Sequence, residues 1–269
     1  MNCFQNATRV VIKVGSSTLT HNSGHINIRR LEQLVKVLSD IQNAGKEIIL
    51  VSSGAIAVGM GKLHMRERPQ DMAAKQATAA VGQCELMYLY DKMFSEYNHT
   101  IAQVLMTRDV VDSQERRCRV VNTFEQLMKL GTIPIVNEND TVSVEEIEFG
   151  DNDTLSAIVA QLTHADVLVL MSDIDGLYTG NPRTDPNAKL IPYVERITPE
   201  IEAIAGGAGS NRGTGGMITK IHAAQIAGAA GIDMAIINGE NPNLLYSLFD
   251  GETVGTHFAC APSSETARE

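Results

Sequence analysis

Short apolar runs alternate along the chain with longer segments of helical periodicity. The apolar runs are rich in Val, Ile and Leu and span residues 9–15, 47–53, 100–106, 132–136, 166–171 and 233–239. Such runs are typical of strands that are buried on both faces, and strands separated by helices tend to pair in parallel. The pattern therefore predicts an α/β fold with a sheet covered on both sides.

The clearest helical pattern lies between residues 28 and 41. Ile28, Leu31, Leu34, Val35, Leu38 and Ile41 fall on one helical face. Gly45 follows at a position where glycine commonly ends a helix. Similar periodicity covers about 71–96, 114–129, 153–162 and 216–229. We expect the helix at 71–96, which is rich in Met and Tyr, to pack in the core.

Three further segments have recognisable local patterns. Residues 143–149 alternate with period two and predict half of a small exposed hairpin. The glycine-dense residues 206–216 predict a loop before a helix, and residues 261–269 predict a disordered tail. No internal repeat or proline-rich linker divides the rest of the sequence, so we expect a single domain over residues 1–260.

The composition is that of an ordinary globular protein whose charge is unevenly distributed. The chain has 269 residues, of which 43% are hydrophobic, and a formal net charge of -10. This balance argues against a nucleic-acid partner. Residues 130–182, the acidic window, contain ten Asp and Glu but no Lys or Arg. A solvated acidic surface is the simplest interpretation of this window before its motifs are considered.

The cysteines and the N-terminal sequence bear on the cellular location. Cys3, Cys84, Cys118 and Cys260 are isolated in sequence, which argues against a disulfide framework or a zinc site. Reduced thiols in the cytoplasm are the simplest account of them. The N-terminus lacks the pattern of a signal peptide and no apolar run approaches 18 residues, so we expect no membrane partner.

Polar residues with chemical potential follow the first two predicted strands. Lys13 lies within an apolar strand that ends in Gly15, where backbone N–H groups could approach an oxyanion. A lysine that snorkels at a strand end is an equal alternative. After the second strand, Ser53 and Gly54 lead into a helical run that could bind a carboxylate or phosphate. A Ser that simply caps the helix is the commoner interpretation.

Carboxylates and amides are mixed in two loops of the acidic window. Residues 137–140 (Asn-Glu-Asn-Asp) follow the fourth predicted strand, and residues 150–154 (Gly-Asp-Asn-Asp-Thr) open a helix. An amide and a carboxylate together can hold a zwitterionic amino acid. Helix capping explains one acid of the second loop but not the cluster.

The second half of the chain carries a candidate polyphosphate site. Residues 213–220 pass from a glycine-rich loop into a helix whose first turn contains Lys220. Free helix N–H groups and a lysine suit phosphate oxygens, although the spacing fits neither the P-loop nor the Rossmann motif. The Asp-Ile-Asp-Gly sequence at 173–176 lacks the closing ligands of a calcium-binding EF-hand and is typical of a turn.

Taken in order, these motifs resemble those of the amino acid kinase family. The resemblance rests on IKVGSS, VSSGAI, VNENDTV, FGDNDTLSAIVA, SDIDGLYTGNPR and RGTGGMITK and runs from about residue 9 to 251. It implies a three-layer α/β/α sandwich around a mainly parallel eight-stranded sheet. It also implies that an N-terminal lobe, about 1–165, binds an amino acid and that a C-terminal lobe, about 166–260, binds ATP.

The members that this chain most resembles phosphorylate the side-chain carboxylate of L-glutamate at the expense of ATP, the first step of proline biosynthesis. By that resemblance, Lys13 and Lys220 contact the transferring phosphoryl group and Asp153 orients both lysines. The residues implied to bind glutamate are Ser53, Asp140 and Asn152. Those implied to bind ATP are Lys13, Ser172, Asp173, Thr214, Gly215, Gly216, Met217, Ile218, Thr219 and Lys220. Mg²⁺ would accompany ATP, and no residue is assigned as its ligand.

The resemblance carries further expectations about regulation and assembly. It implies feedback inhibition by L-proline and a homo-oligomer, either a dimer or a tetramer. Many relatives carry an additional C-terminal domain that resembles RNA-modification modules. After Gly251 only 18 residues remain in this sequence, which is too few for that domain.

Two alternative functions remain open at this point. Another family member would use acetylglutamate, aspartate or UMP as the acceptor. Acetylglutamate has no free ammonium to pair with Asp140, and a UMP site is expected to add Arg near the substrate loops, which the acidic window lacks. A non-catalytic amino-acid or nucleotide sensor would not need to retain Lys13, Asp153 and Lys220 together.

Overall fold

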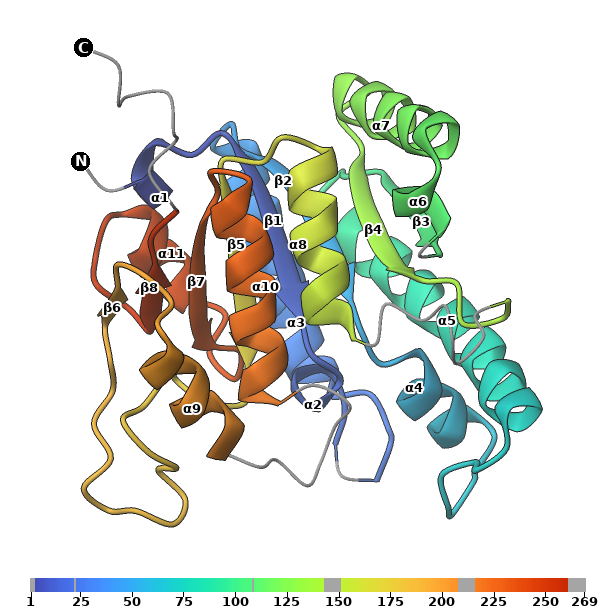
Figure 1. Ribbon diagram of the computed structural model, residues 1–269. Coiled ribbons are helices and arrows are strands. Elements are labelled where there is room, and N and C mark those ends of the chain that lie inside the picture. Colours follow the sequence, from blue (N-terminus) through green and yellow to red (C-terminus); the bar gives the residue numbers. More distant parts are fainter. Residues whose placement is uncertain (1–2, 22, 108, 143–150, 208–215, 261–269) are drawn as a thin grey trace.

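A single twisted sheet runs through the centre of the molecule, between two layers of helices (Figure 1). The computed structural model describes residues 3–21, 23–107, 109–142, 151–207 and 216–260. Within these residues the sheet has eight strands in the order β3-β4-β2-β1-β5-β7-β8-β6. Neighbouring strands are parallel except β7 and β8, which are antiparallel. The predicted three-layer, mainly parallel α/β/α architecture is confirmed.

The strands are short, as expected for a sheet of this kind. Their bounds are β1 Arg9–Val14, β2 Glu47–Ser52, β3 Ile101–Met106, β4 Ile133–Glu138, β5 Val167–Ser172, β6 Tyr193–Val194, β7 Asp233–Asn238 and β8 Thr256–Phe258. All six strands predicted from apolar runs are present, each shifted by at most two residues at its ends. The hydrophobic pattern missed β6 and β8 because two or three residues are too few to establish a period.

Helices of different lengths connect these strands. Their bounds are α1 Cys3–Asn6, α2 Ser16–Leu19, α3 Ile28–Asn43, α4 Ala55–Lys62, α5 Met72–Ser95, α6 Asp109–Asp112, α7 Gln114–Lys129, α8 Asn152–Leu162, α9 Pro199–Gly207, α10 Met217–Ala229 and α11 Leu244–Phe249. The prediction that Gly45 follows the end of this helix is confirmed: α3 ends at Asn43, Ala44 is its C-cap, and Gly45 comes next in the left-handed region at φ +97°. None of the helices in the described part of the chain is long and apolar enough to cross a membrane.

The two faces of the sheet bury separate hydrophobic cores. Along β1, Val10, Ile12 and Val14 join the core beneath α3, α5 and α11, whereas Val11 joins the core beneath α8 and α10. Because side chains alternate along a strand, Lys13 shares the face of Val11 and points toward α8. The apolar periodicity of β1 therefore decides which helix Lys13 meets.

Several sequence predictions concern residues that the structure does not describe. The hairpin predicted at 143–149 and the tail at 261–269 lie outside the described residues. The loop predicted at 206–216 is partly wrong, because α9 continues to Gly207. Residues 208–215 of that loop are not described. The 71–96 helix is mainly a core element, with Tyr90 fully buried, although Tyr88 on the same helix is 60% exposed.

Candidate active site

A cavity of about 870 Å³ lies at the carboxyl ends of the parallel strands. Its lining includes residues that follow β4, β2, β1 and β5, four adjacent strands of the sheet. Open parallel sheets bind ligands at this edge, where the loops after the strands converge. Most of the predicted site residues meet here: Lys13, Ser53, Asp140, Asn152, Asp153, Ser172, Asp173 and Lys220 all line the cavity.

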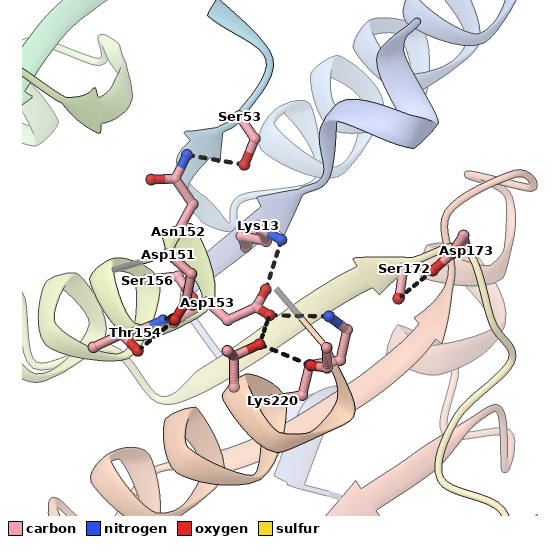
Figure 2. Close-up of polar contacts among 12 residues, drawn as sticks. Lys13, Ser53, Asp151, Asn152, Asp153, Thr154, Ser156, Ser172, Asp173 and Lys220 are labelled. Atoms are coloured by element: carbon pink, nitrogen blue, oxygen red, sulfur yellow. Dashed lines mark hydrogen bonds and ion pairs between the residues drawn. The ribbon is translucent and has the colours of Figure 1, made fainter. Parts of the chain in front are cut away.

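Two lysines and one aspartate form the buried centre of the site. Lys13 Nζ lies 2.6 Å from Asp153 Oδ1, and Lys220 Nζ lies 2.9 Å from Asp153 Oδ2. Figure 2 shows both ammonium groups converging on the single carboxylate. The hydroxyl of Thr219 donates to Asp153 Oδ2 at 2.8 Å. We call Lys13, Asp153 and Lys220 the lysine–aspartate triad.

The triad brings together three elements that are distant in sequence. Lys13 comes from β1, Asp153 from the first turn of α8 and Lys220 from the first turn of α10. The two helices pack side by side over the sheet (Figure 1). Their N-termini bring positive helix dipoles toward the same region. The site is therefore electrically suited to an anion.

Burial makes the ionisation of the triad unusual. Asp153 is 1% exposed, and Lys13 and Lys220 are 8% and 7% exposed. Burial alone would raise the pKa of Asp153, but the charges of Lys13 and Lys220 outweigh this and hold the pKa of that carboxyl well below its usual range. Asp153 is thus an anion that keeps two cations in place, and it carries no proton at neutral pH.

Amide and hydroxyl groups form a second network at one end of the cavity. The side-chain amide of Asn152 donates to Ser53 Oγ and to Asn137 Oδ1, both at 2.9 Å (Figure 2 shows the former). Asn137 in turn donates to Gln83 Oε1 at 2.9 Å. Asn137, Ser53 and Asn152 line the cavity, so this network presents fixed polar groups to a ligand.

The loop after β2 excludes the simplest interpretation of Ser53. The N-cap of α4 is Gly54, at φ 106°, and no side chain caps this helix. The backbone at Gly54 is in the left-handed region that favours glycine. Because Ser53 does not cap α4, its hydroxyl serves the Asn152 network instead.

Capping does apply to the neighbouring acid. Asp151 is the N-cap of α8, and its carboxylate accepts from the backbone N–H and the hydroxyl of Thr154 at 2.8 and 3.1 Å. Burial raises the pKa of Asp151 above its ordinary value, although the bond from Thr154 opposes this. The two acids in this loop thus have different tasks, since Asp151 starts the helix and Asp153 holds the lysines.

The opposite end of the cavity follows β5. The Ser172 hydroxyl donates to Asp173 Oδ1 at 3.2 Å, and Arg183 donates to Asp173 Oδ2 at 2.9 Å. Among the remaining predicted nucleotide residues, Gly216 is the N-cap of α10, Met217 is buried and Ile218 is 60% exposed. Thr214 and Gly215 lie outside the described residues.

Several residues in or beside the cavity were not predicted from the sequence. Four further cations line it: Arg30, Arg68, Lys75 and Arg183. Arg183 directly follows the acidic window, so counting charges within the window hid it. Asn137 belongs to the Asn-Glu-Asn-Asp loop at 137–140 that the sequence indicated, but no individual role was predicted for it. Gln83 had no sequence signal, because a polar residue on a long helix is commonplace.

The cavity at the carboxyl edge of the sheet accepts anions, because buried lysines and helix N-termini face it. In an α/β sandwich, such a site defines a phosphoryl-transfer protein. The model of the amino acid kinase family matches residues 8–238, and the chain belongs to that family.

Individual relatives narrow this assignment. The chain is 55% identical over 259 residues to a protein named glutamate 5-kinase from Clostridium perfringens, covering 95% of this chain and 96% of that protein. It is also 55% identical over 260 residues to glutamate 5-kinase from Listeria welshimeri, covering 95% and 94% of the two chains.

Solved structures with the same fold are much more distant in sequence. UMP kinase from Bacillus anthracis superposes with a TM-score of 0.64 at 16% identity, covering 95% of this chain and 97% of that one. Isopentenyl phosphate kinase from T. acidophilum gives a TM-score of 0.65 at 16% identity, covering 93% and 100%. At this identity the likeness supports the fold alone.

The triad predicts a pH-dependent contribution to stability. Asp153→Asn leaves two buried lysines without their anion, and we expect it to lower the free energy of unfolding by about 3–5 kcal/mol at pH 7. The pKa of Asp153 is depressed in the folded state. The stability that the Asp153 carboxylate contributes is therefore complete above the unfolded pKa of about 3.9, and it is lost as the pH falls through the folded pKa. Denaturant unfolding at several pH values measures both effects.

Asp173→Asn is the matched control, because Asp173 lines the same cavity but pairs with Arg183 at an exposed position. Its loss should change the free energy of unfolding by no more than about 1 kcal/mol. The assigned ionisation is contradicted if the two substitutions lower the free energy of unfolding equally. It is also contradicted if the difference in free energy of unfolding between Asp153→Asn and wild type does not become smaller below about pH 4.

Proposed function

We propose that this chain transfers the γ-phosphoryl group of ATP to the side-chain carboxylate of L-glutamate, giving L-glutamyl 5-phosphate in the first step of proline biosynthesis. The observation that carries the proposal is the 55% identity to proteins named glutamate 5-kinase over nearly their whole length. The buried lysine–aspartate triad in a cavity of suitable size supports it.

The chemistry requires charge neutralisation more than proton transfer. The side chain of glutamate has a reference pKa of about 4.3, so the attacking carboxylate is already ionised at neutral pH. No general base is needed. Asp153 is unsuited to that task in any case, because both of its oxygens face lysine ammonium groups and its pKa is depressed.

The task of the protein is to bring two anions together. A carboxylate and a polyphosphate repel each other, and fixed cations at their meeting point reduce that repulsion in both the ground and the transition state. Lys13 and Lys220 supply two such charges against the single charge of Asp153. Because the carboxylate holds them in advance, they need no reorganisation when phosphate charge moves from the leaving to the attacking oxygen.

The network around Asn152 suits the amino-acid end of the reaction. In this proposal the amide of Asn152 and the hydroxyl of Ser53 bind the acceptor's carboxylate, and Asp140 pairs with its ammonium. Asn137 and Gln83 are positioning residues that fix the orientation of the Asn152 amide. An N-terminal lobe of about 1–165 would thus bind glutamate.

The nucleotide end is assigned to a C-terminal lobe of about 166–260. Ser172 and Asp173 after β5, with the start of α10 from Gly216 to Lys220, would hold ATP together with Thr214 and Gly215. Arg183 pairs with Asp173 and also lines the cavity. It can therefore reach phosphate oxygens as well. The helix N-terminus of α10 favours phosphate binding at this end.

The site also fits a Mg²⁺ ion that arrives on ATP. Of the acids that line the cavity, Asp151, Asp153 and Asp173 already accept hydrogen bonds from protein groups. This arrangement suits a metal that takes most of its ligands from phosphates and water. When bound, the ion would add positive charge beside the transferring phosphoryl group, and the carboxylates of Asp151 and Asp173 could hold its water ligands.

The choice of glutamate over another acceptor does not rest on the charge of the acidic window. Arg30, Arg68 and Lys75 come from outside the window and line the cavity, so the lack of basic residues within it is no argument against a phosphorylated acceptor such as UMP. Glutamate is favoured by the named relatives and by the amide network. Retention of the complete triad favours an enzyme over a sensor.

Three further proposals follow from the kinship with glutamate 5-kinases. L-proline inhibits the enzyme, which displacement of bound glutamate by proline would measure. The chain forms a homo-oligomer, a dimer or a tetramer, which light scattering would reveal. The enzyme works in the cytoplasm, as cell fractionation would show.

An assay of the acceptor tests the proposed function directly. We expect glutamate-dependent release of ADP with ATP and Mg²⁺, and a hydroxamate product when hydroxylamine traps the acyl phosphate. Acetylglutamate, aspartate and UMP serve as competing acceptors in parallel reactions. Turnover with UMP but none with glutamate would overturn the proposal.

Lys220→Ala separates catalysis from acceptor binding. We expect it to reduce kcat by at least about 10²-fold, because it removes a charge that stabilises the transition state, while the Kd for glutamate changes little. Lys62→Ala is the matched control, since Lys62 is exposed and pairs with Glu85 away from the cavity. Unchanged turnover in Lys220→Ala would refute the role assigned to this lysine.

A further inference from the structure

A cluster of potential metal ligands lies at the edge of the sheet opposite the active site. Cys3 of α1, Asp233 at the start of β7 and His257 of β8 each offer a ligand atom, and these atoms lie within 4.8 Å of one another. β7 runs from Asp233 to Asn238, so this cluster is roughly 17 Å from the carboxyl edge of the sheet. It takes no part in the phosphoryl-transfer site.

The topology of the sheet explains how these residues meet. β7 and β8 are antiparallel, with Ala235 opposite His257, so Asp233 and His257 are diagonal neighbours on one face of the sheet. The helix α1 lies over the same end of β7 and β8 (Figure 1). It brings Cys3 to the imidazole from a position 254 residues away in sequence.

The ligand atoms converge on one nitrogen of the imidazole. His257 Nε2 lies 2.6 Å from Asp233 Oδ1 and 3.7 Å from Cys3 Sγ. One thiol, one imidazole and one carboxylate are therefore gathered from three separate elements.

Aromatic packing fixes the orientation of the imidazole. The rings of Phe4 and Tyr193 contact His257 edge to face, with centroid distances of 5.0 and 5.2 Å. Cys3 also lines a surface cavity of about 580 Å³ that runs along this edge of the sheet. The cluster is thus held in place from two sides, with a route to solvent beside it.

An ordinary ion pair between Asp233 and His257 explains only part of this arrangement. Such a pair needs no sulfur ligand, yet the thiol of Cys3 lies 3.7 Å from His257 Nε2. The wide sequence separation is also why the spacing of the cysteines gave no sign of a metal site. Ligands that meet through tertiary structure have no local motif.

We propose that Cys3, Asp233 and His257 bind a Zn²⁺ ion as its three protein ligands, with the fourth position open to solvent. In a tetrahedral zinc site, Zn–N and Zn–S lengths of about 2.0 and 2.3 Å separate a nitrogen and a sulfur ligand by roughly 3.5 Å. The Nε2–Sγ distance of 3.7 Å is close to that value. The Nε2–Oδ1 distance must lengthen by about 0.7 Å to make room for the ion, which a small rotation of the Asp233 side chain provides.

The ligand types select the metal. Thiolate and imidazole ligands favour zinc over Mg²⁺ and Ca²⁺, which prefer oxygen. This site is therefore separate in chemistry as well as in place from the Mg²⁺ that accompanies ATP. Since the ligands lie on α1, β7 and β8, the ion would tie the N-terminal helix α1 to one edge of the sheet.

Cobalt provides a direct readout, because Co²⁺ occupies tetrahedral zinc sites and thiolate–Co²⁺ charge transfer is visible by absorption. The metal-stripped, reduced full-length chain is titrated with Co²⁺. We expect one Co²⁺ per chain with a thiolate charge-transfer band, bleaching of that band by stoichiometric Zn²⁺, and a higher thermal unfolding midpoint with Zn²⁺ than with chelator.

Two variants and one control locate the ion. Cys3→Ser and His257→Gln should each weaken Co²⁺ binding by at least tenfold and abolish the Zn²⁺-dependent shift in unfolding midpoint. The matched control is Cys84→Ser, which removes an exposed thiol of α5 far from the cluster and should bind like wild type. Circular dichroism confirms that each variant is folded.

The proposal is wrong if the full-length chain shows no thiolate charge-transfer band, or if Cys3→Ser and His257→Gln keep it while Cys84→Ser loses it. If Cys3→Ser does not fold, His257→Gln decides, because it leaves the Cys3 thiol in place. A Zn²⁺-dependent rise in the unfolding midpoint that persists in His257→Gln likewise places the ion elsewhere.

Discussion

The structure depends on a single buried carboxylate. Asp153 holds Lys13 and Lys220 at 2.6 and 2.9 Å in a place from which water is almost excluded. Two lysines without this anion would repel each other and would be costly to bury in charged form. The fold brings these three residues together, because α8 packs on β1 and β5, α10 packs on the neighbouring β7, and the two helices contact each other.

The acidic residues of the acidic window have different roles in the structure. Glu138, Asp140, Asp151, Asp153 and Asp173 line the cavity. Asp166 instead accepts from the backbone N–H groups of Thr8 and Arg9, and Asp175 from Asn238 and Tyr178. The window is therefore neither a plain solvated surface nor wholly a functional site. Its cationic partners come from elsewhere in the chain.

The sequence predicted the role of a residue where that residue departs from the local pattern around it. Lys13 in an apolar strand and Asp153 beside a capping Asp151 could both be recognised, because each breaks a local pattern. Arg183, Asn137 and Gln83 could not be assigned, since their roles arise from contacts between distant elements. β6 and β8 escaped detection because they are too short to show a period. The cluster around His257 was missed because its members lie at opposite ends of the chain.

The dependence of kcat on pH tests the central claim, that Asp153 organises cations and transfers no proton. With saturating glutamate and Mg²⁺–ATP, kcat should be constant between about pH 6 and 8, because the acceptor is already ionised and the pKa of Asp153 lies far below this range. A kcat that falls about tenfold per pH unit below an ionisation near neutrality, and that loses this dependence in Asp153→Asn, would make Asp153 a general base and contradict the account.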